Sequence, residues 1–294
     1  KLGDYLSVAA TPTGYVPPLP MLDLSLSGPF SQEELDKYIH VAKSFHQPVI
    51  IRSIITPEEV EAITDEFVLV ACNNTGGKFI DNNLLESNRN IKLKDALNIG
   101  ERGGLFQALD CCNMNMPRAV HMPTNPEYWE KDNATALVVA RLFHTKMHSH
   151  PDVTVHFALR NNKRWTILHP DAVSQVNPKF GRTVPMGTTL FINETMGLKR
   201  WEFDTHQGDV LIIPPWGFHG IEYYNATTTV SWLASIYNHD VIFEHPTLSI
   251  PYFAHILRSN WRVALWAMME SYSEPFLLID RVAAAIKHEV YSKH

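Results

Sequence analysis

The chain has 294 residues, of which 45% are hydrophobic and 19% charged, so it can bury a full core as one large domain or as one domain with appendages. Its formal net charge of −6 gives no electrostatic reason to expect binding to nucleic acid or to an anionic membrane, and no run of about 18 apolar residues could span a bilayer. Cys72, Cys111 and Cys112 are too few and too irregular for a zinc cluster or a disulfide framework, and the adjacent pair is expected to be buried as small apolar residues.

The first 135 residues predict an arm followed by mixed helices, strands and loops. Residues 1–30 are expected to form an extended arm, because prolines cluster between 11 and 30. Ser31 and Glu34 then form a capping-box motif. The helix that follows has apolar residues at helical spacing, which are Leu35, Tyr38, Ile39, Ala42 and Phe45.

The rest of the region 31–135 is less regular. The β-branched run QPVIIRSI at 47–54 predicts a strand. Thr56-Pro57-Glu58-Glu59 begins a second helix, whose expected apolar face is Val60, Ile63 and Phe67. Residues 73–135 are polar and contain glycine, so loops around a site are expected there.

From 136 to 236 the pattern changes to short strands separated by turn residues. The strand segments are ALVVARLF, VTVHFALR, RWTILH, TTLFI, GDVLIIP, HGIEYY and TTTVSWLASI. Their number and spacing favour an antiparallel barrel or sandwich. Residues 237–294 read as apolar helices interrupted at Pro275, and we expect them to pack on the barrel or to form a homodimer interface.

Three histidines in this strand region predict a metal site. His148 and His150 are two residues apart, and such neighbours on a strand point to one face. His219 begins a later strand, after a Pro-Pro-Trp corner. Three imidazoles inside a small barrel would hold a divalent transition metal and leave positions open for oxygen or a chelating substrate. His144 and His156 share the strand phase of His148 and are expected to flank this site without binding the metal.

A lysine accompanies the histidines. Lys163 lies fifteen residues after His148, on the strand expected to pair with the one that carries the first two histidines. Its ammonium group would therefore point at an anionic group near the metal.

These motifs resemble the JmjC-type, cupin-like hydroxylases, which use iron(II) and 2-oxoglutarate. That family has His-x-Asp, then Lys-Arg fifteen residues after the first ligand, then Gly-Asp-Val-Leu-x-Ile-Pro before the last ligand histidine. His148 and His219 fall on its two histidine positions, and Lys163 matches the lysine that pairs with the distal carboxylate of 2-oxoglutarate. Thr145 matches a hydroxyl that binds the same carboxylate, and Ser231 occupies a strand position that is often polar near the cofactor.

The resemblance implies a mainly β fold. It implies a double-stranded β-helix over 136–236, with N-terminal α/β elements that extend one sheet and C-terminal helices outside. It also implies dimerisation through residues 237–294. The segment QPVIIRSI resembles the N-terminal strand of the family.

The chain departs from the family at one ligand. His150 stands where the family has a carboxylate, which leaves one more positive charge on the metal site and should raise its redox potential. Asp152 is an alternative ligand, about 7 Å further along the same strand face. A ligand set of His150, Asp152 and His219 would recreate His-x-Asp, but it would shift Lys163 and Thr145 out of register, so the set with His148 is preferred.

Three classes of function remain open on these grounds. The first is an iron(II) and 2-oxoglutarate oxygenase that hydroxylates a protein side chain or a small molecule. The second is a three-histidine metal dioxygenase that does not use 2-oxoglutarate, and the third is a non-catalytic metal-binding or interaction protein. Sequons at Asn73, Asn133, Asn193 and Asn225 favour the secretory pathway over the cytoplasm.

Overall fold

The computed structural model describes residues 31–45, 47–81, 84–99, 101, 103–109, 134–150, 152–169, 172, 179–183, 187–191 and 197–236. The expected N-terminal arm at 1–30 and the expected C-terminal helices at 237–294, with their dimer interface, lie outside the described residues. Within the described part of the chain, no helix combines the length and the apolar character needed to cross a membrane.

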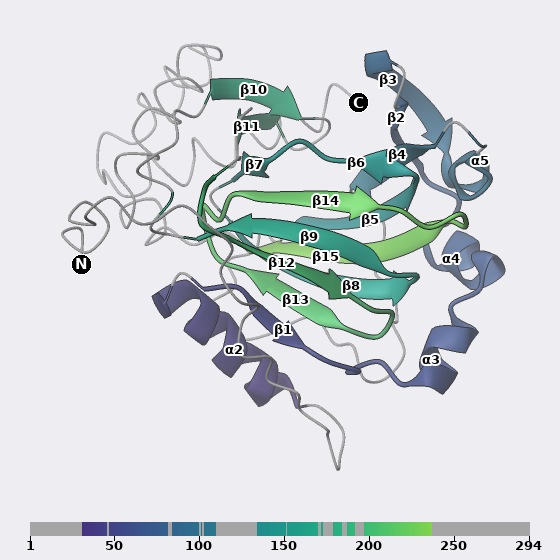
Figure 1. The fold of residues 1–294 in the computed structure, drawn as a ribbon. Helices are drawn as coiled ribbons and strands as arrows, with labels where there is room; N and C mark the ends of the chain where they lie inside the picture. The colour runs from purple at the N-terminus through teal and green to yellow at the C-terminus, as the bar shows by residue number, and fades with distance from the viewer. Residues whose placement is uncertain are drawn as a thin grey trace, which may run out of the picture.

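Two antiparallel sheets make up most of the described structure, as Figure 1 shows. The larger sheet has the order β1 (Val49–Ile51), β13 (Val210–Ile213), β8 (Val153–Arg160), β15 (Thr229–Ile236), β5 (Ala134–Arg141), β4 (Gly104–Leu109), β2 (Gly76–Asp81) and β3 (Leu84–Lys92). The smaller sheet has the order β10 (Lys179–Thr183), β11 (Gly187–Phe191), β7 (His148–Ser149), β14 (His219–Tyr223), β9 (Lys163–Leu168) and β12 (Arg200–Thr205), with β6 (Phe143–His144) beside β14. The prediction of a mainly β protein with antiparallel strands is confirmed.

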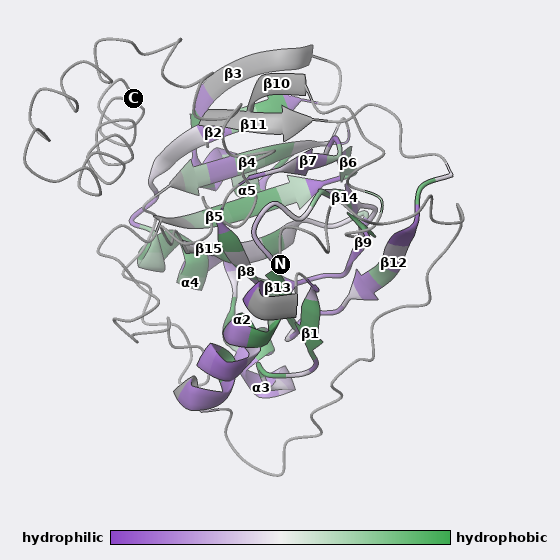
Figure 2. Cartoon of the chain, turned by 90° about the vertical axis from the view of Figure 1, so that its left-hand side faces the viewer, coloured by the Kyte–Doolittle hydropathy of each residue, from purple (hydrophilic) through white to green (hydrophobic). Residues whose placement is uncertain are grey.

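Side chains alternate along the strands and pack in two separate hydrophobic cores. On β13, Val210 and Ile212 pack in a core that includes helical residues, whereas Leu211 and Ile213 pack with residues of the smaller sheet. Because successive side chains of a strand point to opposite faces, the second core lies between the two sheets. Figure 2 shows hydrophobic residues (green) along β5 and hydrophilic ones (purple) along α2 (Gln32–Phe45) and β12.

The helices cover the outer face of the larger sheet. In α2 the predicted capping box is present, since Glu34 N–H donates to Ser31 Oγ (3.2 Å) and Ser31 N–H donates to the Glu34 carboxylate (3.0 Å). The predicted apolar residues that the structure describes there, from Leu35 to Ala42, are buried. The second predicted helix is instead two helices, α3 (Pro57–Ala62) and α4 (Asp65–Ala71), because Thr64 Oγ1 accepts the N–H of Phe67 and begins a new helix.

The segment 73–135 is more regular than its composition indicates. Its described residues form β2, β3, α5 (Leu93–Leu97) and β4 in place of loops. The strand β2 is mostly half-buried and polar, so it has no strong hydrophobic alternation, and its pairing with β3 and β4 determines its conformation. β12 was likewise missed, although Trp201, Phe203 and Thr205 alternate with more exposed residues along it.

Hydrogen bonds of the Gly-Asp turn before β13 hold the residues that follow β1 against the larger sheet. Asp209 Oδ2 accepts from Arg52 Nη1 (2.5 Å) and from the His206 N–H (2.7 Å), while Oδ1 accepts from the Ser53 N–H (3.1 Å). Gly208 has φ of 91°, and a Cβ there would lie 2.6 Å from Ile55 O. Glycine is therefore needed at the turn, and aspartate at the junction.

Cys72 ends α4 and is disulfide-bonded, which the sequence did not predict. The other two cysteines of the chain, Cys111 and Cys112, lie outside the described residues. A stable disulfide is typical of proteins that fold in an oxidising compartment.

Candidate metal centre

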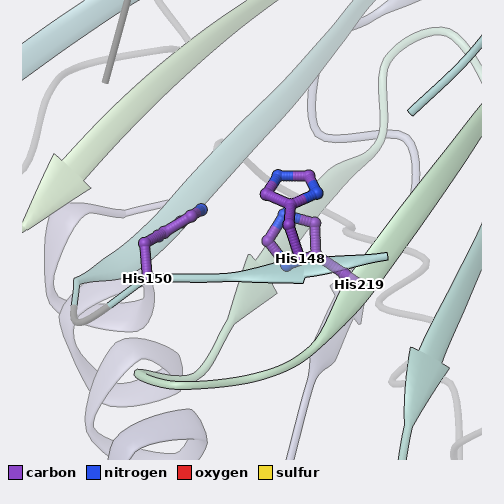
Figure 3. A group of neighbouring side chains, drawn as sticks. All are labelled: His148, His150 and His219. Atoms are coloured by element: carbon purple, nitrogen blue, oxygen red, sulfur yellow. The ribbon is translucent and has the colours of Figure 1, made fainter. Parts of the chain in front are cut away.

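Three histidines converge from two neighbouring strands of the smaller sheet. His148 and His219 are the first residues of β7 and β14 and lie directly opposite each other in the strand pairing, and His150 follows the short strand β7. One ligand atom from each ring lies within 4.8 Å of those of the other two. Figure 3 shows the rings of His148 and His219 close together, with the His150 ring directed toward them from one side.

Each of the three rings is oriented by a hydrogen bond at its Nδ1. His148 Nδ1 lies 2.7 Å from Lys146 O, and His219 Nδ1 lies 2.9 Å from Gly217 O. His150 Nδ1 lies 2.5 Å from Asp152 Oδ1. Since these partners are acceptors, each Nδ1 carries the proton and donates, which leaves the lone pair of each imidazole on Nε2.

Desolvation keeps two of these imidazoles neutral. Burial, with a smaller contribution from nearby His150, lowers the pKa of His148 to about 4. Burial and the two neighbouring imidazoles also lower the pKa of His219 well below its usual value. Neutral imidazole is the form that binds metal, so protons do not compete strongly at neutral pH. Three nitrogen ligands suit iron, zinc, copper or nickel and leave coordination positions open, so the residues fit a divalent transition metal.

Asp152 lies beside this cluster and outside it. It is fully buried, and its carboxylate accepts from His150 and from Thr154 Oγ1 (3.2 Å). Burial raises the pKa of Asp152, but His150 and a hydrogen bond with Ser235 outweigh it, so the net pKa is below its ordinary value. The predicted alternative ligand therefore contacts a ligand histidine.

Lys163 is fully buried between the sheets at the start of β9. Its Nζ donates to Ser231 Oγ on β15 and lies 3.1 Å from His156 Nε2 on β8. Among the described residues no carboxylate forms an ion pair with it. Burial lowers the pKa of Lys163 well below its usual value, because the charged form is desolvated. An anionic ligand beside this amine would favour its charged form and could pair with it.

The Trp165 ring lies near both the lysine and the histidine cluster. The Trp165 ring centroid lies 6.0 Å from Lys163 Nζ and 6.1 Å from the His219 ring centroid. Thr145, by contrast, is engaged in the sheet, where its hydroxyl accepts the Ile221 N–H (2.8 Å) and forms no hydrogen bond with Lys163 within the described structure.

The contact between His156 and Lys163 was not predicted from the sequence. It is buried, its ring stands edge-on to Trp165 at 4.9 Å between centroids, and it contacts Lys163 directly. The signal was present in the strand alternation, because His156 shares the phase of Thr154 and Ala158, opposite to that of Val155 and Phe157 in the helix-covered core. Thus His156 lies on the inner face of β8, beside Lys163.

Neither a family model nor a curated protein matches the chain.

Proposed function

We propose that the protein is an oxygenase that binds iron(II) through His148, His150 and His219 and 2-oxoglutarate through Lys163. It would hydroxylate a C–H bond of a protein side chain or small molecule. The observation that carries the proposal is Lys163, a fully buried lysine with no ion-pairing carboxylate among the described residues. The Trp165 ring lies near this lysine and also near the cluster of three imidazoles. A buried amine near a metal site suits an anionic cosubstrate.

The strand order supports a double-stranded β-helix as the scaffold. Numbered one to eight in chain order, β5, β7, β8, β9, β12, β13, β14 and β15 are arranged as 1-8-3-6 in the larger sheet and as 2-7-4-5 in the smaller one. This is the order of two nested Greek keys, as in jelly rolls and cupins. In such a scaffold the ligands from strands two and seven meet at one end of the barrel.

The residues of the candidate site would each have a defined role in this reaction. Iron(II) and 2-oxoglutarate would supply oxygen activation, and the overall reaction would convert 2-oxoglutarate, dioxygen and R–H to succinate, carbon dioxide and R–OH. Lys163 and Ser231 would hold the distal carboxylate, with His156 beside them. Trp165 would exclude water between the two ends of the cosubstrate, which strengthens the ion pair with the lysine.

A second function is favoured by His150. Many iron(II) oxygenases use two histidines and one carboxylate, whereas here the third group is an imidazole. A three-histidine dioxygenase that acts on a chelating substrate without 2-oxoglutarate is therefore the alternative enzyme. A metal-binding protein without catalysis is the third possibility.

The compartment and the oligomeric state are proposed on separate grounds. The disulfide at Cys72 and the four sequons support an oxidising, secretory compartment. A homodimer through residues 237–294 remains part of the proposal, which rests on the sequence alone.

Titration of the anaerobic iron(II) protein with 2-oxoglutarate, followed by a succinate assay in air, tests the proposal. We expect a charge-transfer band and uncoupled succinate in the wild type, and neither in Lys163→Ala. Lys94→Ala, which removes an exposed lysine on α5, is the matched control and should behave as the wild type. Binding without succinate would favour the non-catalytic protein, and no binding by a metal-loaded wild type would favour the alternative dioxygenase; either result overturns the leading proposal.

A further inference from the structure

His150 stands where the resembling family has a carboxylate ligand, and the Asp152 carboxylate contacts this histidine. We propose that Asp152 is a positioning residue that acts on the metal through His150, so that the pair supplies the negative charge that a ligand carboxylate supplies in the resembling family. This inference rests on the proposed metal centre, and it concerns only how the chain adjusts that centre.

The geometry fixes Asp152 as the partner of His150. His150 Nδ1 lies 2.5 Å from Asp152 Oδ1, and the side chain of Asp152 has no exposed surface. Thr154 Oγ1 donates to the other carboxylate oxygen at 3.2 Å, and the Ser235 hydroxyl also bonds to the carboxylate. Thr154 and Ser235 lie opposite each other on β8 and β15, so two strands of the larger sheet hold the carboxylate in place.

The three ligand histidines differ in what their Nδ1 contacts. His148 and His219 donate to neutral backbone carbonyls, at Lys146 O and Gly217 O, and only His150 donates to a carboxylate. The single carboxylate thus bonds to the imidazole at the position where the resembling family has its carboxylate ligand. This position favours a functional role for the pair.

The charge balance follows from this placement. Three neutral imidazoles around a divalent ion leave two positive charges, whereas two imidazoles and a carboxylate leave one. With ionised Asp152 bonded to His150, the ion, its ligands and this carboxylate again sum to one positive charge. A carboxylate that accepts from a ligand imidazole also fixes its tautomer and ring orientation and raises the basicity of the ligating nitrogen. In a buried site this charge is screened only weakly.

Metal affinity is the direct test, measured by competition of zinc or cobalt(II) against a chelator on the full chain. Asp152→Asn should bind about 10–100-fold more weakly than the wild type, the usual effect of losing such a partner. The cobalt(II) absorption spectrum should keep its three-histidine form, because the ligands themselves are unchanged. Asp95→Asn, on α5 and exposed, is the matched loss of a carboxylate and should leave the affinity unchanged.

A mutant cycle separates action through His150 from a general effect of charge. In a His150→Ala background, Asp152→Asn should change metal affinity far less than it does in the wild type, because the connection to the metal is already lost. Equal weakening in both backgrounds would overturn the inference, and so would unchanged affinity in Asp152→Asn. If the wild type itself binds no divalent metal, the proposed centre fails, which is a different result.

A measurement on the unmodified sequence covers the case in which Asp152→Asn does not fold. In the zinc-loaded protein, the Nδ1 proton of His150 should resonate well downfield of those of His148 and His219, since it alone is shared with a carboxylate. Three equivalent Nδ1 protons would contradict the proposed pair.

Discussion

Asp209→Ala is expected to lower the free energy of unfolding by about 3–5 kcal/mol, the usual cost of removing one partner of a buried ion pair. The side chain of Asp209 is only 2% exposed, and it accepts from Arg52 and from two backbone N–H groups, of Ser53 and His206. Its loss would leave the guanidinium without its carboxylate and two N–H donors without acceptors. Since Arg52 follows β1 and Asp209 precedes β13, the edge of the larger sheet should weaken first.

Urea unfolding of the metal-free protein measures this effect. Asp204→Ala is the matched control, because Asp204 forms a more exposed ion pair with Arg164 at 3.2 Å, and such pairs contribute about 0–1 kcal/mol. If Asp209→Ala were no more destabilising than Asp204→Ala, the junction would not have the structural role assigned to it.

Lys163 is expected to make the stability of the ligand-free protein rise with pH. The unfolded chain holds the proton of this lysine up to about its ordinary pKa of 10.5, whereas the folded chain releases it at lower pH, because burial lowers the pKa. Between the two pKa values the unfolded state binds more protons, so the free energy of unfolding increases by up to about 1.4 kcal/mol per pH unit. The destabilisation is complete below the folded pKa and fades as the pH approaches 10.5.

Comparison with Lys163→Met isolates this contribution from other titrating groups. Methionine is unbranched and flexible, so it fits the space of the lysine stem, and it carries no charge. Denaturant unfolding at several pH values in buffers without carboxylates should give a stability difference between the variant and the wild type that shrinks as the pH rises. A difference that stays constant across the range would mean that Lys163 remains protonated in the folded protein.

Much of the scaffold could be predicted from sequence because local signals were strong there. The strands of 136–236 are rich in β-branched and aromatic residues, and the capping boxes at Ser31 and Thr56 mark helix starts that the structure contains. The strands β2 to β4 have no such signal and form through pairing across the sheet. The contact between Arg52 and Asp209 joins residues far apart in the chain, so no local pattern could predict it.

The site was predictable in its residue types and less so in its contacts. Alternation along a strand placed His148 and His150 on one face, and the motif spacing selected His219 and Lys163. The spacing of about 7 Å assumed for His150 and Asp152 requires an extended strand. β7 ends at Ser149, so this regular spacing does not apply, and the two side chains are in hydrogen-bonding contact. Strand periodicity applies only to regular strands, so it could not predict that Asp152 contacts His150.

The metal content of the full chain, purified without a polyhistidine tag, tests the central claim most directly. The account predicts close to one divalent transition metal ion per chain in the wild type and close to none in the double variant His148→Ala/His219→Ala. His144→Ala, which removes an exposed imidazole on β6 outside the cluster, should keep the metal content of the wild type. Equal metal content in the wild type and the double variant would contradict the account.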